Sequence, residues 1–80
     1  MPAPSPAIAA PLENALRDLG QRLRTRRKRL GVSATTTAEA AGMSRVTLHR
    51  IERGEPSVAM GAYLSAASAL GLDFELSDAL

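Results

Sequence analysis

The sequence predicts an all-α protein, a compact bundle of short helices, on three observations. Two short segments each begin after a serine, Ser33 or Ser44, and end at a glycine, Gly42 or Gly54. Serine is a favoured N-cap and glycine a favoured helix terminator. Leucine and alanine recur at spacings of three and four residues before and after these segments, which is the period of a helix face packed on a core. A period-two pattern, typical of a strand, occurs only near the end of the chain.

The 80 residues suffice for one domain, and no cysteine is present to cross-link it. Because a core of this size is only marginally stable, we expect dimerisation to contribute. The lack of cysteine fits a reducing compartment. No apolar run approaches the roughly 20 residues of a transmembrane helix, and the beginning MPAPSPAIAAP lacks the cations of a signal peptide. We therefore expect a cytoplasmic protein with no membrane contact.

Positive charge is concentrated in the middle of the chain, although the net charge is only +2. All ten Lys and Arg residues lie between Arg17 and Arg53, where three carboxylates oppose them, so this window carries +7. The residues after Arg53 hold four carboxylates and no cation. Such clustering is typical of a surface that binds a polyanion. For the run RLRTRRKR (22–29) alone, a solvated helix face explains the pattern equally well.

The pattern divides the chain into three parts. Residues 1–11 are built mainly of Pro, Ala and Ser, which bury too little surface to fold, so we expect a disordered N-terminal arm. Residues 12–72 hold the helices, and residues 73–80 form a short C-terminal tail. Apolar and polar residues alternate over 72–76, which favours a short strand that pairs with the same strand of a second copy. A frayed tail is the alternative.

The first and last helices follow from their apolar stripes. Leucines recur at helical spacing over 12–30, and Gly31 ends this helix. Gly20 lies inside it at a cost of about 1 kcal/mol relative to Ala, which allows a bend or a late start there. The last helix is expected to be capped by Ser57, to bury a stripe from Met60 to Leu70 and to end at Gly71.

Between them, the spacing predicts a helix-turn-helix unit. A helix of about eight residues over 34–41 is followed by a turn of Gly42, Met43 and Ser44 and by a second helix of about nine residues. In such units the second helix enters the major groove of DNA. Leu48 and Ile51 can anchor that helix on a core, while its other faces carry cations.

Residues 19–72 resemble the Xre/Cro/C1-type helix-turn-helix domain of phage repressors and small bacterial regulators. The motifs that carry the resemblance are R-x-x-x-G at 27–31, Ala38 with Gly42, the segment 44–54 that closes in IERG, and ALGL at 69–72. The resemblance implies a lambda-repressor-like bundle of four to five helices that binds double-stranded DNA, at a palindromic operator, as a homodimer. It also implies an ion pair between Arg27 and Glu52, and a buried guanidinium does need a carboxylate.

The resemblance further implies roles for the third helix. Its base-reading positions are occupied here by Ser44, Arg45, Val46 and Arg50. Arg45 can bond to guanine, and Val46 can contact a thymine methyl. Thr47 and His49 are reserve base readers. Phosphate binding is implied for the start of the second helix and for the end of the third, at Ser33, Ala34 and Arg53.

Two residues depart from the family pattern. Ala34 stands where many relatives have Gln, which removes one usual DNA contact. Thr37 stands where Leu is usual, which thins the core beneath the second helix. Both departures concern the DNA contacts more than the fold.

The leading hypothesis is a transcriptional regulator. The alternative is an antitoxin of the HipB type, which binds its own promoter and neutralises a partner toxin, and a third class is a nonspecific nucleic-acid binder. We expect no enzyme, because the chain has no cysteine, one histidine and no phosphate-binding glycine loop. His49 has no further ligands with which to form a metal site. We also expect no cofactor and no small-molecule substrate.

Overall fold

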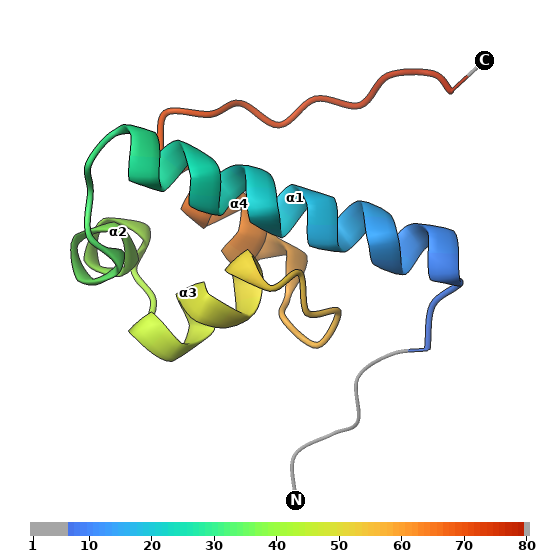
Figure 1. The fold of residues 1–80 in the computed structure, drawn as a ribbon, viewed down its shortest axis with the longest axis horizontal. Helices are drawn as coiled ribbons and strands as arrows, with labels where there is room; N and C mark the ends of the chain where they lie inside the picture. Colours follow the sequence, from blue (N-terminus) through green and yellow to red (C-terminus); the bar gives the residue numbers. More distant parts are fainter. Residues whose placement is uncertain (1–6, 80) are drawn as a thin grey trace, which may run out of the picture.

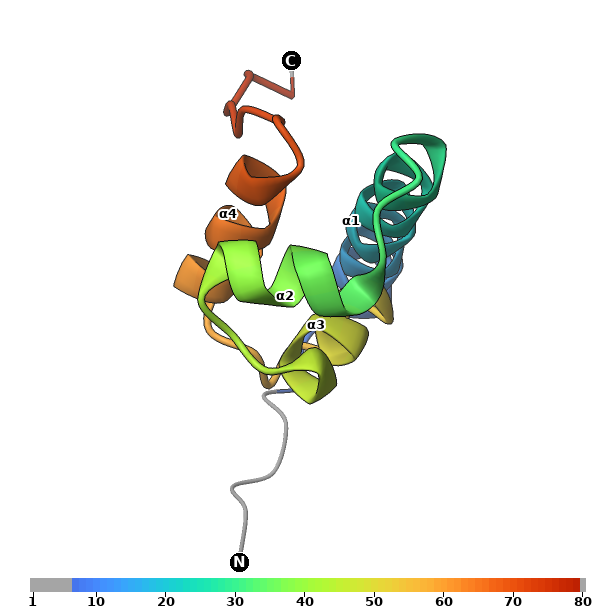
Figure 2. The ribbon, with the colours of Figure 1, turned by 90° about the vertical axis from the view of Figure 1, so that its left-hand side faces the viewer.

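The computed structural model describes residues 7–79, and within them the fold is all-α, as predicted. Four helices form a small bundle in which α1 packs against α3, α4 lies across from α1, and α2 packs against α3 and α4 at one end (Figure 1, Figure 2). The helices are α1 (Ala10–Arg29), α2 (Ala34–Ala41), α3 (Arg45–Glu52) and α4 (Met60–Ala69). None of the helices in the described part of the chain has the length and hydrophobicity needed to span a membrane.

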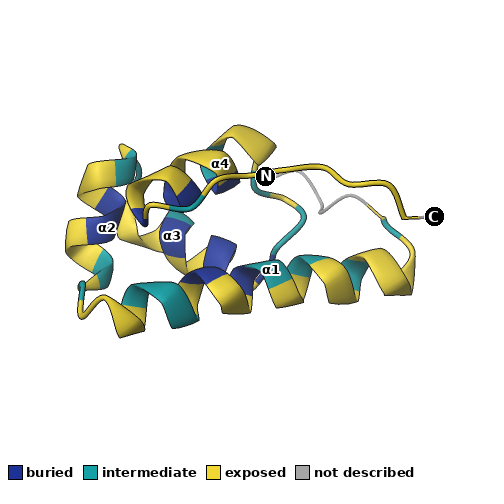
Figure 3. Ribbon diagram, turned by 90° about the horizontal axis from the view of Figure 1, so that it is seen from above, coloured by how far each residue is buried: buried dark blue, intermediate teal, exposed yellow. Residues whose placement is uncertain are grey.

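One hydrophobic core joins the four helices, and the buried positions face one another across it (Figure 3). Leu48 and Ile51 of α3 are 0% exposed. Burial of each contributes roughly 1.5 to 3 kcal/mol, so these two side chains hold a helix that is too short to be stable alone. The core residues are Leu23, Ala38, Leu48, Ile51, Tyr63, Ala66, Ala67 and Leu70.

α1 ends before Gly31 as predicted, but it begins earlier than expected. It begins at Ala10, so the expected arm is shorter, and residues 1–6 of that arm lie outside the described residues. It runs through Gly20 as one continuous helix, and Gly20 is buried where α1 packs against the end of α3. Leu12 and Leu30 are exposed, so the leucine stripe extends beyond the part that packs.

α2 and α3 begin and end where their local signals indicate. The Ser33 and Ser44 side chains accept hydrogen bonds from the amides of Thr36 and Thr47. Gly42 ends α2 with φ of 71°, a left-handed conformation that favours glycine. Thr37 is buried, and its hydroxyl donates to the carbonyl of Ser33 at 3.0 Å, so the polar atom in the core is satisfied.

α4 starts later than expected. Its N-cap is Ala59, without a side-chain hydrogen bond, so Ser57 does not cap it. Met60 and Leu64 were expected in the buried stripe but are exposed, whereas the neighbouring Tyr63 is buried. The Tyr63 hydroxyl donates to the carbonyl of Glu55 at 2.8 Å and so fixes the loop between α3 and α4.

After α4 the chain forms an extended tail, residues 72–79, with neither helix nor strand. The tail runs back along α1, on the side opposite α3 (Figure 1, Figure 2). A strand at this place would need a second copy to pair with, so pairing across a dimer stays a prediction. Residue 80 lies outside the described part of the chain.

Candidate nucleic-acid interface

α3 lies at the edge of the bundle with one face free (Figure 2). Leu48, Ile51 and Glu52 are its buried residues. Of the residues expected to read bases, only Thr47 is half-buried, and the exposed ones are Ser44, Arg45, Val46, His49 and Arg50. The structure therefore brings the expected base readers together on the solvent side of one helix. Val46 is 61% exposed, which leaves its methyl groups free for a contact.

Three of these side chains already have partners in the free protein. The Ser44 hydroxyl accepts from the Thr47 amide and donates to the Thr47 hydroxyl, both at 3.1 Å. These two residues therefore stabilise the start of α3, and base contacts would have to share the same oxygens. Arg45 donates to the Thr35 hydroxyl of α2 at 3.4 Å, a long and exposed hydrogen bond that DNA can replace.

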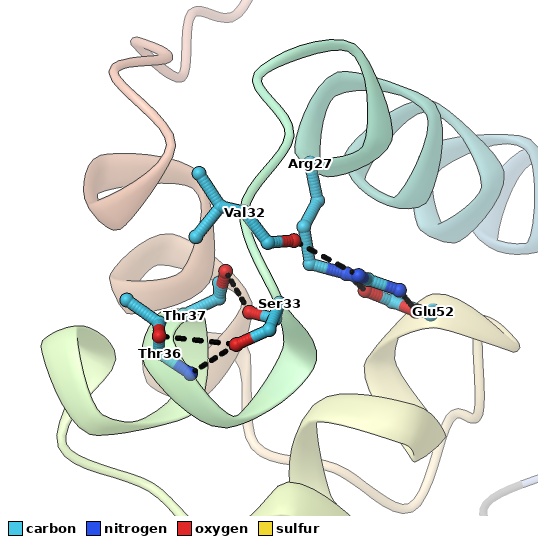
Figure 4. A network of polar contacts seen from close by, with 6 residues as sticks. All are labelled: Arg27, Val32, Ser33, Thr36, Thr37 and Glu52. Carbon is cyan, nitrogen blue, oxygen red and sulfur yellow. Dashed lines mark hydrogen bonds and ion pairs between the residues drawn. The ribbon is translucent and has the colours of Figure 1, made fainter.

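The start of α2 presents a second set of candidate contacts. Ser33 accepts from the Thr36 amide at 3.1 Å and donates to the Thr36 hydroxyl at 3.0 Å (Figure 4). The remaining amides of the first turn lie at the positive end of the helix dipole, which favours a phosphate. Ser33 is exposed and Ala34 half-buried, so the first turn is open to solvent on one side.

Arg27 and Glu52 connect α1 to the end of α3 (Figure 4). Arg27 donates to both carboxylate oxygens of Glu52, at 2.7 and 3.2 Å, and to the carbonyl of Val32 at 3.1 Å. The two side chains are only 12% and 5% exposed. The hydrogen bond from Arg27 to Glu52 raises the pKa of Arg27 above its ordinary value, while burial acts in the opposite direction. The ion pair that the resemblance implies is thus present, and it fixes α3 and the α1–α2 loop on the same guanidinium.

Arg53, expected to bind phosphate, carries an ion pair that sequence reasoning missed. Its guanidinium donates to the Glu55 carboxylate at 2.8 and 3.2 Å. Both side chains remain accessible, at 66% and 34% exposure, so a phosphate can compete for Arg53. The two residues are only two positions apart, a spacing at which the loop after a helix can bring opposite charges together.

The RLRTRRKR run divides between two sides of α1. Arg22, Arg26 and Arg29 line a groove that also contains Leu72 of the tail, and Arg26 donates to the carbonyl of Leu70 at 3.1 Å. Arg24 and Arg27 instead line a cleft against α3. Successive helical residues are rotated by about 100°, so alternate positions of the run point in nearly opposite directions. That spacing could have predicted the division, and the expected ion pair between Arg27 and Glu52 could have predicted which side faces α3.

The described residues contain no group of three or more His, Cys, Asp or Glu side chains that could hold a metal ion. Within residues 7–79, no buried side-chain nitrogen or oxygen lacks a hydrogen-bond partner. The polar groups that can recruit a ligand are therefore the exposed ones on α3, at the start of α2 and along α1.

Comparison with known proteins finds a matching family model and similar solved structures. The family model described as a helix-turn-helix domain matches residues 18–80. The chain is also similar to a solved structure, the restriction-modification controller protein C.AhdI from Aeromonas hydrophila, with 35% sequence identity and a TM-score of 0.66. That match covers 75% of this chain and 91% of the other. Among curated protein sequences, no match was found.

Proposed function

Because this chain belongs to the helix-turn-helix domain family of the Xre/Cro/C1 type, it is a DNA-binding transcriptional regulator, and we propose that it binds a palindromic operator as a homodimer. One observation supports the proposal most directly. α3 is an eight-residue helix anchored by buried Leu48 and Ile51, and it carries exposed Arg45, Val46 and Arg50 at the edge of the bundle. A helix of this kind fits the major groove of DNA.

In the proposed complex, different side chains of α3 contact different bases. Arg45 donates a bidentate pair of hydrogen bonds to guanine once it leaves Thr35, and Val46 contacts a thymine methyl. Arg50 reaches the next base edge along the groove, with Ser44 and Thr47 as further base contacts, and His49 lies on the flank of α3 that faces α1. The first turn of α2 at Ser33 and Ala34, together with Arg53, holds phosphates and sets the position of α3.

Exposed apolar side chains in the C-terminal tail support the proposed dimer. The tail lies on the face of the bundle away from α3 (Figure 1, Figure 2), and its Phe74 and Leu76 are 41% and 94% exposed. Apolar side chains that alternate along an extended segment can be buried by a second copy, which leaves both α3 helices free. Two such helices read half-sites separated by about one helical turn, roughly 34 Å.

Selection of bound sequences from random duplex DNA tests the proposal. The wild-type protein should select a palindrome, and Arg45→Ala should lose the preference at one position of each half-site. Arg53→Ala is the matched control, since it removes the same charge from a phosphate contact, and it should lower affinity with an unchanged consensus. Equal binding of random and selected DNA by the wild type would reject the operator and leave only nonspecific binding.

The similarity to a restriction-modification controller protein favours a narrower second candidate, the control of a restriction–modification gene pair. A reporter fused to the promoter upstream of such a pair should respond to this protein, and the selected palindrome should occur there. The antitoxin hypothesis stays a prediction. A toxin gene beside the coding sequence and a stable complex of the two products would be needed to support it.

A further inference from the structure

α1 and α3 enclose a cleft of about 270 Å³ on the flank of the candidate DNA-binding helix. Arg24 and Arg27 contribute from α1, and His49, Glu52 and Arg53 contribute from the end of α3. The cleft therefore brings together cations from two helices that are far apart in the sequence.

The charges in the cleft leave a positive surplus. Arg27 and Glu52 bind each other and largely cancel. Arg53 has an exposed ion pair with Glu55. Arg24 and His49 form no side-chain hydrogen bond or ion pair with any residue in the described range 7–79, and both are exposed. Donors without acceptors thus line the mouth of the cleft, where an anion can bind without displacing a buried partner.

The cleft lies beside α3, where the phosphates of DNA would lie if α3 entered the major groove. An α-helix with its side chains is about 10 to 12 Å across, and the major groove of DNA is about 12 Å wide. A helix that enters the groove therefore has a row of phosphates along each flank. His49 and Arg53 lie on the flank of α3 that faces α1, and Arg24 faces them from across the cleft.

From this arrangement we infer that Arg24, with His49 and Arg53, binds a backbone phosphate of the DNA through the α1–α3 cleft. The inference deepens the proposed function and rests on α3 entering the groove. It also resolves the two interpretations of the RLRTRRKR run. Arg24 belongs to the polyanion-binding surface, whereas Arg22, Arg26 and Arg29 belong to the opposite side of α1, next to the tail.

Arg24→Gln and Arg29→Gln form a matched pair for the test, since each removes one exposed cation from the same helix. We expect Arg24→Gln to weaken binding to both selected and random duplexes by roughly 3- to 10-fold at low salt. The slope of log affinity against log salt concentration should become shallower by about 0.9, the value for one lost phosphate contact. Arg29→Gln should stay within about 2-fold of the wild type, and Arg24→Lys, which keeps the charge, should retain the wild-type slope.

Equal losses for Arg24→Gln and Arg29→Gln would overturn the inference, because they would indicate only the general charge of α1. An altered consensus in Arg24→Gln would also overturn it, since a phosphate contact carries no base preference. The proposed function fails on a different measurement, an absence of sequence preference in the wild-type protein. The two variants can still be compared on random DNA in that case, so the two failures are distinguishable.

Discussion

Gly20 of α1 lies directly against Gly54 beyond the end of α3. A Cβ atom on Gly20 would lie 2.8 Å from the Gly54 amide nitrogen and also clash with the carbonyl of Ile51, and one on Gly54 would lie 2.5 Å from the carbonyl of Leu16. The two glycines thus let the backbones of α1 and the α3 terminus touch. This contact sets how closely α3, which carries the candidate DNA-binding face, packs against α1.

We therefore predict that Gly20→Ala destabilises the protein, although alanine favours a helix by about 1 kcal/mol over glycine. The added methyl group meets backbone atoms that cannot rotate away, and such overpacking costs about 1 to 3 kcal/mol. Gly61→Ala in α4 is the control, since a Cβ there meets nothing within 4 Å, and it should stabilise slightly. Urea unfolding of both variants measures the difference. A Gly20→Ala variant as stable as Gly61→Ala would mean that the contact between α1 and α3 can relax without cost.

The sequence predicts structural features that depend on neighbouring residues, such as helix caps, better than features that depend on distant residues, such as the packing of Gly20. Ser33, Ser44 and Gly42 act on amides and carbonyls within four residues, so their spacing predicts α2 and the start of α3 correctly. Gly20 acts on residues more than thirty positions away. The pattern along one segment allowed a bend or a late start at Gly20 and could not indicate its close contact, because the atoms that Gly20 contacts lie at the end of another helix.

The same limit applies to the candidate interface. The exposed face of α3 follows from helical periodicity and the buried anchors Leu48 and Ile51. Which half of the α1 cations faces α3 depends on how α1 crosses the bundle, and periodicity alone cannot determine that. Met60 lies in the first turn of α4 and is exposed, although its spacing from Tyr63 and Ala67 fits the buried stripe.

Because the ion pair between Arg27 and Glu52 is buried, we predict that a conservative substitution of Glu52 strongly destabilises the protein. Glu52→Gln keeps the shape of the side chain but leaves the guanidinium of Arg27 buried without a carboxylate, which should cost about 3 kcal/mol or more. Glu13→Gln is the control, because it breaks an exposed ion pair with Arg17 and should cost about 0.5 kcal/mol or less. Both are measured by urea unfolding. Similar small losses in the two variants would show that Arg27 finds another partner.

We expect Glu55→Gln to increase DNA affinity. The Glu55 carboxylate occupies Arg53 in the free protein, so removing its charge frees the guanidinium for phosphate. An exposed ion pair contributes about 0.2 to 1 kcal/mol, which corresponds to a gain of roughly 1.5- to 5-fold. Asp78→Asn in the tail, which lies on the face of the bundle away from α3 (Figure 1, Figure 2), removes the same charge as a control and should change affinity less. An equal gain in both variants would attribute the effect to net charge rather than to Arg53.

The raised pKa of Tyr63 lets us predict how the folding stability of the protein changes at alkaline pH. Burial, and secondarily the charge of Glu55, raises the pKa of Tyr63 to about 12. The unfolded chain should ionise near the usual value of about 10, so above that pH the unfolded state binds fewer protons than the folded state. The contribution of Tyr63 to stability is therefore fully present below about pH 10 and is lost as the pH rises toward 12.

Two measurements check this dependence. Tyr63 is the only tyrosine of the chain, so ultraviolet absorbance of phenolate reports this group alone, and its midpoint should shift from about 12 in the folded protein to about 10 in urea. Tyr63→Phe should lose about 1 kcal/mol at neutral pH with the hydrogen bond to Glu55, but its stability should fall less between pH 10 and 11 than that of the wild type. If both proteins lost stability in parallel over that interval, the alkaline transition would belong to other groups, and the hydroxyl of Tyr63 would serve only to hold the loop after α3.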